Sequence, residues 1–206
     1  MVLKSQIRAD MKAFLSGLSP ADRHARSVAA CQQLAATHEF KNAQMIMIYL
    51  SMPTELETGT LAVRAWQEGK SIAVPRVDWN GQRMEPVEIR SLDVGIRTTG
   101  PGVREPITGT VVPLRMIDLI VVPGQAFDRQ GRRVGRGRGF YDRFLAQQDI
   151  QALRCGLCFH EQVLPNAIPA EPHDMLMNLV ITDREVFRCG HEQKGFQGGN
   201  GPSARP

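Results

Sequence analysis

The sequence is poor in cysteine and in long apolar runs, and each shortage argues against a class of protein. Four cysteines in 206 residues are too few for the disulfide framework of a small secreted domain, so we expect a reducing compartment. No run of about eighteen apolar residues occurs, as a membrane-spanning helix would need. The charged segment 1–15 lacks the apolar core of a secretory signal. We therefore expect a cytoplasmic protein with no membrane partner.

Two of the cysteines, Cys155 and Cys158, form a Cys-x-x-Cys pair of the kind used in zinc sites and redox motifs. No second pair completes a zinc set, and the pair lies in an alternating apolar run at 152–159. In such a run, cysteine acts as a small apolar side chain of a buried strand. We favour this structural interpretation, with metal or redox chemistry as the alternative.

Both of the common nucleotide-binding loops are also missing. There is no G-x-x-x-x-G-K-[ST] motif, and the glycines of Gly135-x-Gly137-x-Gly139 are spaced too closely for a dinucleotide-binding fingerprint. The sequence also shows no Ser/His/Asp or Cys/His arrangement for nucleophilic catalysis. A nucleotide site in this chain must therefore use another type of loop.

What is present is a globular composition with one unusual segment. Hydrophobic residues make up 42% and charged residues 22%. The length suits one domain, which we place at 1–189, followed by a disordered tail at 190–206. The net charge is +4, and the whole excess falls in 128–143, which holds six arginines and two aspartates. Such a segment predicts an anionic ligand.

Hydrophobic periodicity predicts an α/β fold. Helices are expected at 2–17, 19–37, 58–69 and 140–148. Strands are expected at 43–50, 71–75, 84–89, 116–123, 152–159 and 178–182. Ser19 and Thr58 are predicted helix caps, Gly69 a helix stop, and the Gly/Pro/Thr-rich region 91–109 a surface connection. Strands that alternate with helices imply a mostly parallel central sheet with helices on both faces, flanked by the N-terminal helices.

The Gly/Arg-rich segment 124–139 lies between a buried strand and a helix, where α/β proteins bind ligands. Its glycines let backbone N–H groups face an anion. Arg133, Arg136 and Arg138 offer planar donors for phosphate oxygens. The pattern favours a polyphosphate site, and an RNA-binding segment is the alternative from another class.

Four acidic residues could complete this site. Asp142 lies in the first turn of the following helix, where it either stabilises the helix end or holds Mg²⁺ beside phosphates. Asp174 precedes the last predicted strand and could supply a second oxygen ligand. Glu55 and Glu57 follow the first predicted strand. They are either solvated, or one of them hydrogen-bonds a donor-rich heterocycle.

Together these segments resemble the 5-formyltetrahydrofolate cyclo-ligase family, also called 5,10-methenyltetrahydrofolate synthetases, over about residues 4–182. The strongest match is the string Pro123-Gly124-x-Ala126-Phe127-Asp128-x-x-Gly131-x-Arg133-Val134-Gly135-x-Gly137-x-Gly139-Phe140-Tyr141-Asp142-Arg143. Shorter matches follow the family's order: Lys4-x-x-x-Arg8, Leu50-Ser51-x-x-x-Glu55-x-Glu57-Thr58, Val74-Pro75-Arg76 and Arg104-Glu105-Pro106. Chance does not readily produce so long an ordered set.

The resemblance implies a three-layer α/β/α fold, similar to sugar-phosphate isomerases and CoA transferases, that binds MgATP and 5-formyltetrahydrofolate. It assigns ATP binding to Lys4, Arg8, Arg133, Val134, Gly135, Arg136, Gly137, Arg138, Gly139, Phe140 and Tyr141. It assigns folate binding to Leu50, Glu55, Arg136, Gly137, Arg138, Gly139 and Phe140. It assigns Mg²⁺ to Asp142 and Asp174. Spacing alone, in contrast, makes Lys4, Arg8 and Lys12 a solvated row on the first helix.

Two positions depart from the family's usual pattern. Phe140 stands where tyrosine is usual, so any role of that hydroxyl is lost while the ring is kept. Arg138 stands where lysine is common, which keeps the charge and changes its geometry.

The implied activity is ATP-dependent closure of 5-formyltetrahydrofolate to 5,10-methenyltetrahydrofolate, with ADP and phosphate, through an iminium phosphate. This chemistry needs no protein nucleophile, so positioning and charge would drive it. We predict Arg138 and Glu55 as the catalytic residues: Arg138 neutralises the transferring phosphoryl and Glu55 orients the folate. We expect a monomeric ligase of one-carbon metabolism without a nucleic-acid partner. A relative that acts on another phosphorylated or formylated molecule is the alternative.

Overall fold

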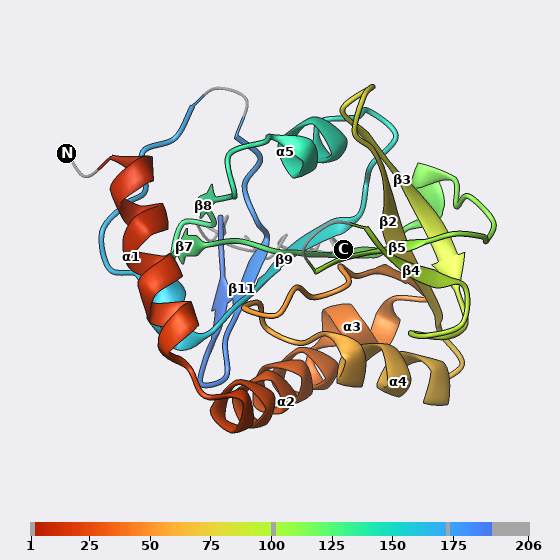
Figure 1. Cartoon of the computed structure of the whole chain (residues 1–206), viewed down its shortest axis with the longest axis horizontal. Helices are drawn as coiled ribbons and strands as arrows, with labels where there is room; N and C mark the ends of the chain where they lie inside the picture. The colour runs from red at the N-terminus through yellow and green to blue at the C-terminus, as the bar shows by residue number, and fades with distance from the viewer. Residues whose placement is uncertain (1–2, 100–101, 172–173, 191–206) are drawn as a thin grey trace, which may run out of the picture.

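The computed structural model describes residues 3–99, 102–171 and 174–190 of the chain (Figure 1). Within these ranges a central sheet has the strand order β12-β11-β9-β6-β1-β2-β3. Its strands are β1 (Met45–Met47), β2 (Ser71–Asp78), β3 (Arg83–Ile89), β6 (Leu119–Val122), β9 (Leu153–Leu157), β11 (Leu179–Ile181) and β12 (Val186–Arg188). The five inner strands pair in parallel, and the two edge strands, β3 and β12, are antiparallel. The predicted mostly parallel sheet is confirmed.

Helices cover both faces of this sheet, so the three-layer prediction is confirmed. Figure 1 shows α2 (Pro20–Ala36), α3 (His38–Asn42) and α4 (Gly59–Gln67) on one side, and α5 (Phe140–Leu145) on the other. Successive residues of the strands alternate between the two cores. Ile46 and Val121 pack with the α2 and α4 layer, whereas Met47 and Val122 pack with α5. Strands buried on both faces explain why their sequences are continuously apolar.

A smaller sheet lies beside the first helix. Its order is β10-β7-β8, and its strands are β7 (Ala126–Asp128), β8 (Arg133–Val134) and β10 (Val163–Leu164). Helix α1 (Lys4–Gly17) packs Ile7 against Ala126 and Val134 of this sheet. The expectation that both N-terminal helices flank the central sheet therefore needs correction: only the end of α1, through Leu15, reaches the main core.

Of the three residues predicted to cap or stop a helix, Ser19 and Gly69 are confirmed and Thr58 is not. Ser19 Oγ accepts a hydrogen bond from the Asp22 backbone N–H at the start of α2, and Gly69 takes φ +73° just after α4. Thr58, predicted to cap α4, instead donates its hydroxyl proton to the Tyr49 carbonyl at 2.6 Å. The buried carbonyl at the end of a strand needs that donor more than the helix end does.

Several elements were not expected from the sequence. The region 91–109 is more than a connection, because it contains the hairpin of β4 (Ile96–Thr99) and β5 (Val103–Pro106). The Gly/Arg-rich segment contains β7 and β8, and its helix α5 is shorter than predicted. Short 3-10 helices occur at Leu114–Met116 and His160–Gln162. The tail prediction falls on residues outside the described ranges, except for the exposed Gly190.

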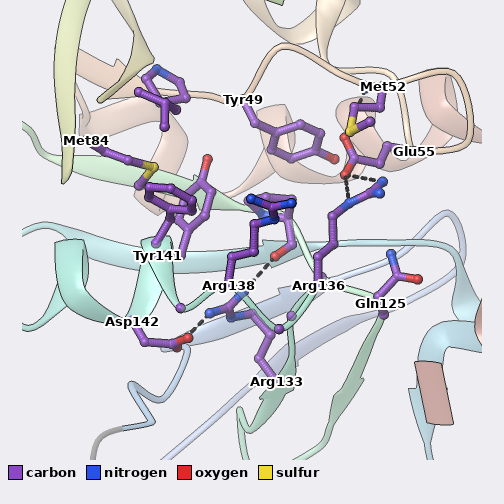
Figure 2. Close-up of a pocket in the computed structure, with 18 of the residues that line it drawn as sticks. Tyr49, Met52, Glu55, Met84, Gln125, Arg133, Arg136, Arg138, Tyr141 and Asp142 are labelled. Atoms are coloured by element: carbon purple, nitrogen blue, oxygen red, sulfur yellow. Dashed lines mark hydrogen bonds and ion pairs between the residues drawn. The ribbon is translucent and has the colours of Figure 1, made fainter. Parts of the chain in front are cut away.

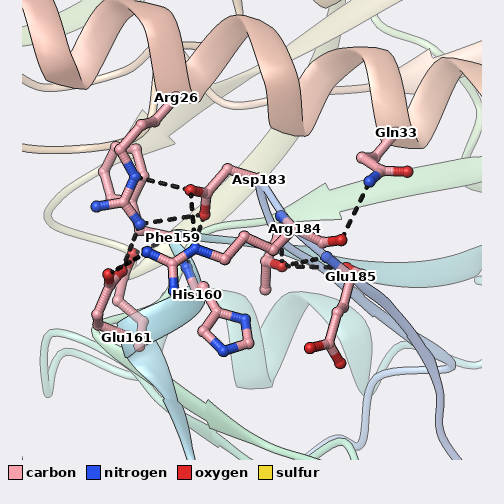
Figure 3. Close-up of polar contacts among 10 residues, drawn as sticks. Arg26, Gln33, Phe159, His160, Glu161, Asp183, Arg184 and Glu185 are labelled. Atoms are coloured by element: carbon pink, nitrogen blue, oxygen red, sulfur yellow. Dashed lines mark hydrogen bonds and ion pairs between the residues drawn. The ribbon is translucent and has the colours of Figure 1, made fainter.

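An ion-pair cluster ties α2 to the loops that follow β9 and β11 (Figure 3). Arg26 donates to Asp183 at 2.7 Å and also to Glu161, and Arg184 pairs with Glu161 at 2.9 Å. The Arg26 guanidinium lies 5.0 Å from the centre of the Phe159 ring. Burial raises the pKa of Asp183, but the hydrogen bonds from Arg26 and from the His160 backbone N–H and the nearby Arg26 charge together outweigh it, so the net pKa is lowered. The cluster holds one helical layer against the sheet.

Candidate active site

A cavity of about 370 Å³ opens at the carboxyl ends of β1, β2 and β6. The chain leaves β1 with β2 on one side and β6 on the other, and such a switch point is the usual ligand site of open α/β sheets. Every residue predicted to bind a ligand lines this cavity (Figure 2 labels several of them). They are Lys4, Arg8, Leu50, Glu55, Arg133, Val134, Gly135, Arg136, Gly137, Arg138, Gly139, Phe140, Tyr141, Asp142 and Asp174.

The loop from β8 to α5 forms one wall of the cavity. Gly137 and Gly139 take φ +93° and +66°, a backbone conformation that side chains with a Cβ disfavour. A Cβ at Gly139 would also lie 2.8 Å from an Arg143 nitrogen. The glycines therefore allow a tight loop along this wall of the cavity.

The arginines of this loop differ in their partners. Arg133 donates to Asp142 at 2.6 Å and to the Pro123 carbonyl at 3.1 Å. Arg136 pairs with Glu55 at 2.9 Å (Figure 2). Arg133 Nε and the Tyr141 hydroxyl are buried and have no hydrogen-bond partner in the part of the chain that the structure describes. Both residues line the cavity, and an unpartnered buried polar atom is uncommon in a folded protein.

The structure separates the two glutamates that the sequence left undecided. Glu55 lines the cavity, and its two carboxylate oxygens accept from Arg136 and from the Met52 backbone N–H. Glu57 turns away from the cavity and pairs with His24 at 2.8 Å. Glu55 is therefore the acidic group that can meet a ligand.

The first helix brings two cations to the cavity. Arg8 Nε donates to the Gly135 carbonyl at 2.8 Å, and Lys4 Nζ lies 2.7 Å from Asp174 and 3.0 Å from Glu171. Burial lowers the pKa of Lys4, but these two carboxylates outweigh it and the net pKa is raised. Lys12 alone of the basic row is exposed. The solvated interpretation of the row is therefore wrong for Lys4 and Arg8, because α1 packs on the small sheet rather than standing in solvent.

Asp142 and Asp174 both line the cavity, and both are already paired with cations. Within the described ranges no three His, Cys, Asp or Glu side chains form a metal-binding group. Two carboxylates still suit Mg²⁺, which takes hard oxygen donors and commonly uses one or two carboxylates together with phosphate oxygens. The donor set therefore fits a metal that arrives with a phosphorylated ligand.

Several lining residues were not singled out from the sequence. Tyr49, Met84 and Gln125 lie on or beside strands, and Trp79 lies in the turn between β2 and β3. Val103–Glu105 come from the unexpected β4–β5 hairpin. Burial raises the pKa values of both Tyr49 and Tyr141, so both stay protonated at neutral pH. The only sequence signal for the hairpin was the match at Arg104-Glu105-Pro106.

The Cys-x-x-Cys pair lies outside the cavity. Cys155 is in β9 and Cys158 follows it, and both are fully or almost fully buried. Burial raises the pKa of both thiols, which makes them poor nucleophiles and ligands. Their packing in the two cores agrees with the structural interpretation.

Over the described ranges, no helix is both long and apolar enough to cross a membrane.

A family model described as the 5-formyltetrahydrofolate cyclo-ligase family matches residues 1–183. A 5-formyltetrahydrofolate cyclo-ligase of Mus musculus is 31% identical over 86% of this chain and 92% of its own. A probable 5-formyltetrahydrofolate cyclo-ligase of Schizosaccharomyces pombe is 28% identical over 90% and 97%.

Solved structures agree with these sequence relatives. The 5,10-methenyltetrahydrofolate synthetase of Aquifex aeolicus superposes with a TM-score of 0.80 and 26% identity, over 97% of this chain and 100% of its own. A synthetase of the same name from Mycoplasma pneumoniae is 18% identical with a TM-score of 0.71, over 88% and 99% of the two chains. The second likeness concerns the fold alone.

Proposed function

The chain belongs to the 5-formyltetrahydrofolate cyclo-ligase family, and we propose that it converts 5-formyltetrahydrofolate and ATP to 5,10-methenyltetrahydrofolate, ADP and phosphate. The observation that carries the proposal is the ion pair between Glu55 and Arg136. It joins the acidic loop after β1 to the Gly/Arg loop, so one cavity offers groups for a heterocycle and for a polyphosphate.

The reaction has two steps that the cavity can promote. An N-formyl group is a poor electrophile because the nitrogen lone pair is delocalised into the carbonyl. The formyl oxygen attacks the γ-phosphorus, the bond between that phosphorus and ADP breaks, and an iminium phosphate forms. N10 then attacks the iminium carbon, loses its proton, and the C–O bond to phosphate breaks. No step needs a covalent bond to the protein, so the chain acts by positioning and charge.

The side chains divide this work between the two substrates. Arg8 and Lys4, from α1, and the backbone N–H groups of the glycine loop hold the triphosphate. Arg138 faces the phosphoryl group and neutralises its charge in the transition state. Glu55, together with Leu50 and Phe140 of the cavity wall, orients the folate ring. Asp142 and Asp174 hold Mg²⁺, which neutralises phosphate charge when it is bound.

A single assay tests the proposal. The purified protein is mixed with ATP, MgCl₂ and 5-formyltetrahydrofolate, and the near-ultraviolet absorbance of the methenyl product is followed. We expect product to appear in proportion to enzyme, with one ADP released per ring closed. Folded protein that forms no product overturns the proposal. An ADP release that does not need the folate points instead to a relative with another substrate.

Salt dependence separates the alternative RNA-binding function. Binding through several phosphates to the arginine loop would fall steeply with salt and would occur without ATP turnover. We expect no such binding, because Arg133 and Arg136 are engaged with carboxylates of the cavity wall. We also propose that the protein acts as a monomer, since one chain supplies every residue named above. Sedimentation during turnover tests this.

A further inference from the structure

We propose that Trp79 is a positioning residue whose indole ring holds the Arg138 guanidinium where it meets the transferring phosphoryl group. Trp79 lies in the turn between β2 and β3 and lines the same cavity as Arg138. The inference rests on the proposed function, because it assumes a phosphoryl group for Arg138 to meet. It adds a residue outside the Gly/Arg loop to the machinery of that loop.

Arg138 differs from the other arginines around it. Arg133 and Arg136 are paired with carboxylates, and Arg143 donates to two backbone carbonyls. Within the described ranges the Arg138 guanidinium has no hydrogen bond or ion pair, and its contact is with the Trp79 ring, whose centre lies 5.4 Å from Cζ. Trp79 therefore places the group while its donors stay available.

The geometry of a guanidinium explains how an aromatic ring can position it while its N–H donors stay available. Its N–H donors lie in the plane of the group, and an aromatic ring contacts the face. Cζ of Arg138 lies over the Trp79 ring, so a phosphate oxygen can approach Arg138 from the side away from the indole. A lysine ammonium has no such face, so arginine at position 138 and tryptophan at position 79 suit each other.

Trp79 is itself firmly held. Its Nε1 donates to Glu105 at 3.1 Å, and Glu105 is only 3% exposed. Its ring meets the Phe140 ring edge-on, with centres 5.2 Å apart and planes at 78°. Asp78 closes the turn by accepting from the backbone N–H groups of Asn80 and Gly81. Anchors on β5 and α5 thus hold the indole in one orientation, and Phe140 serves here through its ring.

A double-mutant cycle tests the coupling. Trp79→Leu removes the ring, and we expect kcat to fall about three- to fivefold, the scale of a cation–π contact at an exposed site, while the dissociation constant for ATP changes less than about twofold. In an Arg138→Ala background the same substitution should lower kcat by less than about twofold. Trp79→Phe, which keeps a smaller ring, should recover part of the loss. Losses that multiply, or no loss in Trp79→Leu, overturn the proposal.

Tryptophan fluorescence gives a measurement that would not change if Trp79 had only a structural role. The chain has two tryptophans, so Trp66→Phe, at a position on α4 outside the cavity, leaves Trp79 as the only reporter. We expect the Trp79 emission to change when MgATP binds, and the change to disappear in Arg138→Ala. An emission that MgATP leaves unchanged, in a protein that turns over, contradicts the proposal.

These experiments separate the inference from the proposed function. If the wild-type protein forms no methenyl product, the proposed function fails. The contact between Trp79 and Arg138 can still be measured in that case. The Trp79 emission of the Trp66→Phe protein is compared with that of the Trp66→Phe/Arg138→Ala protein. Equal emission in the two proteins overturns the contact itself. Far-ultraviolet circular dichroism and thermal unfolding check that each variant is folded.

Discussion

The Nη2 atom of Arg133 lies 2.6 Å from Oδ1 of Asp142, and this ion pair joins β8 to the first turn of α5 across the three glycines of the loop. Arg133 is almost buried, with 5% of its side chain exposed, and Asp142 is 22% exposed. One aspartate therefore braces the loop and also presents an oxygen to the cavity. The predicted magnesium ligand has a structural task as well.

We expect Asp142→Asn to lower both the affinity for Mg²⁺ and the stability. The Mg²⁺ concentration for half-maximal turnover should rise at least about tenfold, because a carboxylate is replaced by a neutral amide. Without metal, the free energy of unfolding should fall by about 1–3 kcal/mol, because Arg133 loses its charged partner. Magnesium titration and urea unfolding measure the two effects. Exposed Asp149, converted to Asn, is the matched control and should change neither.

Glu55 and Glu57 provide a matched pair two residues apart. Glu55→Gln should lower kcat/KM for the folate by about 100-fold, because the oriented charge in the cavity is lost. Glu57→Gln, whose side chain pairs with His24 on the surface, should stay within about twofold of wild type. Steady-state kinetics with varied folate at saturating MgATP measure both. Equal effects of the two substitutions would remove Glu55 from the site.

Arg138→Ala should reduce turnover by about 100-fold or more, the scale of one preorganised electrostatic contact with a transition state. The control is Arg129→Ala, in the same basic segment but exposed and stacked on Phe187 outside the cavity. That variant should keep nearly full activity. Single-turnover measurement of methenyl product is the appropriate assay, since it isolates chemistry from product release. Near-wild-type turnover of Arg138→Ala would exclude the residue from the mechanism.

The Arg26 cluster predicts a pH-dependent contribution to stability. The pKa of Asp183 is lowered from 3.8 and that of Glu161 from 4.5, in each case because hydrogen bonds and the charge of Arg26 together outweigh the effect of burial. A lowered folded-state pKa gives stability that is complete above the ordinary pKa and is lost as pH falls through the folded value. Arg26→Met, which keeps an apolar contact with Phe159, should cost about 1–3 kcal/mol at pH 7.

The difference between wild type and Arg26→Met should shrink as the pH falls below about 4, where the carboxylates become protonated in both proteins. Urea unfolding at several pH values measures it. Arg64→Met is the control, because Arg64 forms an exposed pair with Glu68 on one helix that is worth about 0.5 kcal/mol or less. A gap that stays constant or widens in acid would contradict this account.

The features that the sequence predicted well depend on neighbouring residues. Continuous apolar runs marked β1 and β6, which are buried on both faces of the sheet. Ser19 and Gly69 marked helix ends, because a cap or a positive φ is a local requirement. The Gly/Arg loop was located for the same reason. The conformational freedom of its glycines and the positive charge of its arginines can be recognised within one short segment.

The features that it missed depend on residues far apart. Lys4 meets Asp174 from the other end of the chain, 170 positions away, and Arg136 meets Glu55 from 81 positions away. The β4–β5 hairpin was hidden by its Gly, Pro and Thr content. Thr58 failed as a cap because the Tyr49 carbonyl, nine positions away, accepted its hydroxyl proton. For Lys4 and Thr58, a partner unknown from the sequence outweighed a local preference.

The sequence by itself determined the layered α/β architecture and the place of the Gly/Arg loop and, through its family resemblance, predicted which residues line one cavity. These follow from periodicity, backbone requirements of glycine and motif order. Only the tertiary structure showed which contacts these residues make: Glu55 lines the cavity while Glu57 pairs with His24, Arg8 donates to the Gly135 carbonyl, and Arg138 lies over the Trp79 ring. Packing of α1 on the small sheet and folding of β2–β3 over α5 create those contacts, and no local pattern encodes them.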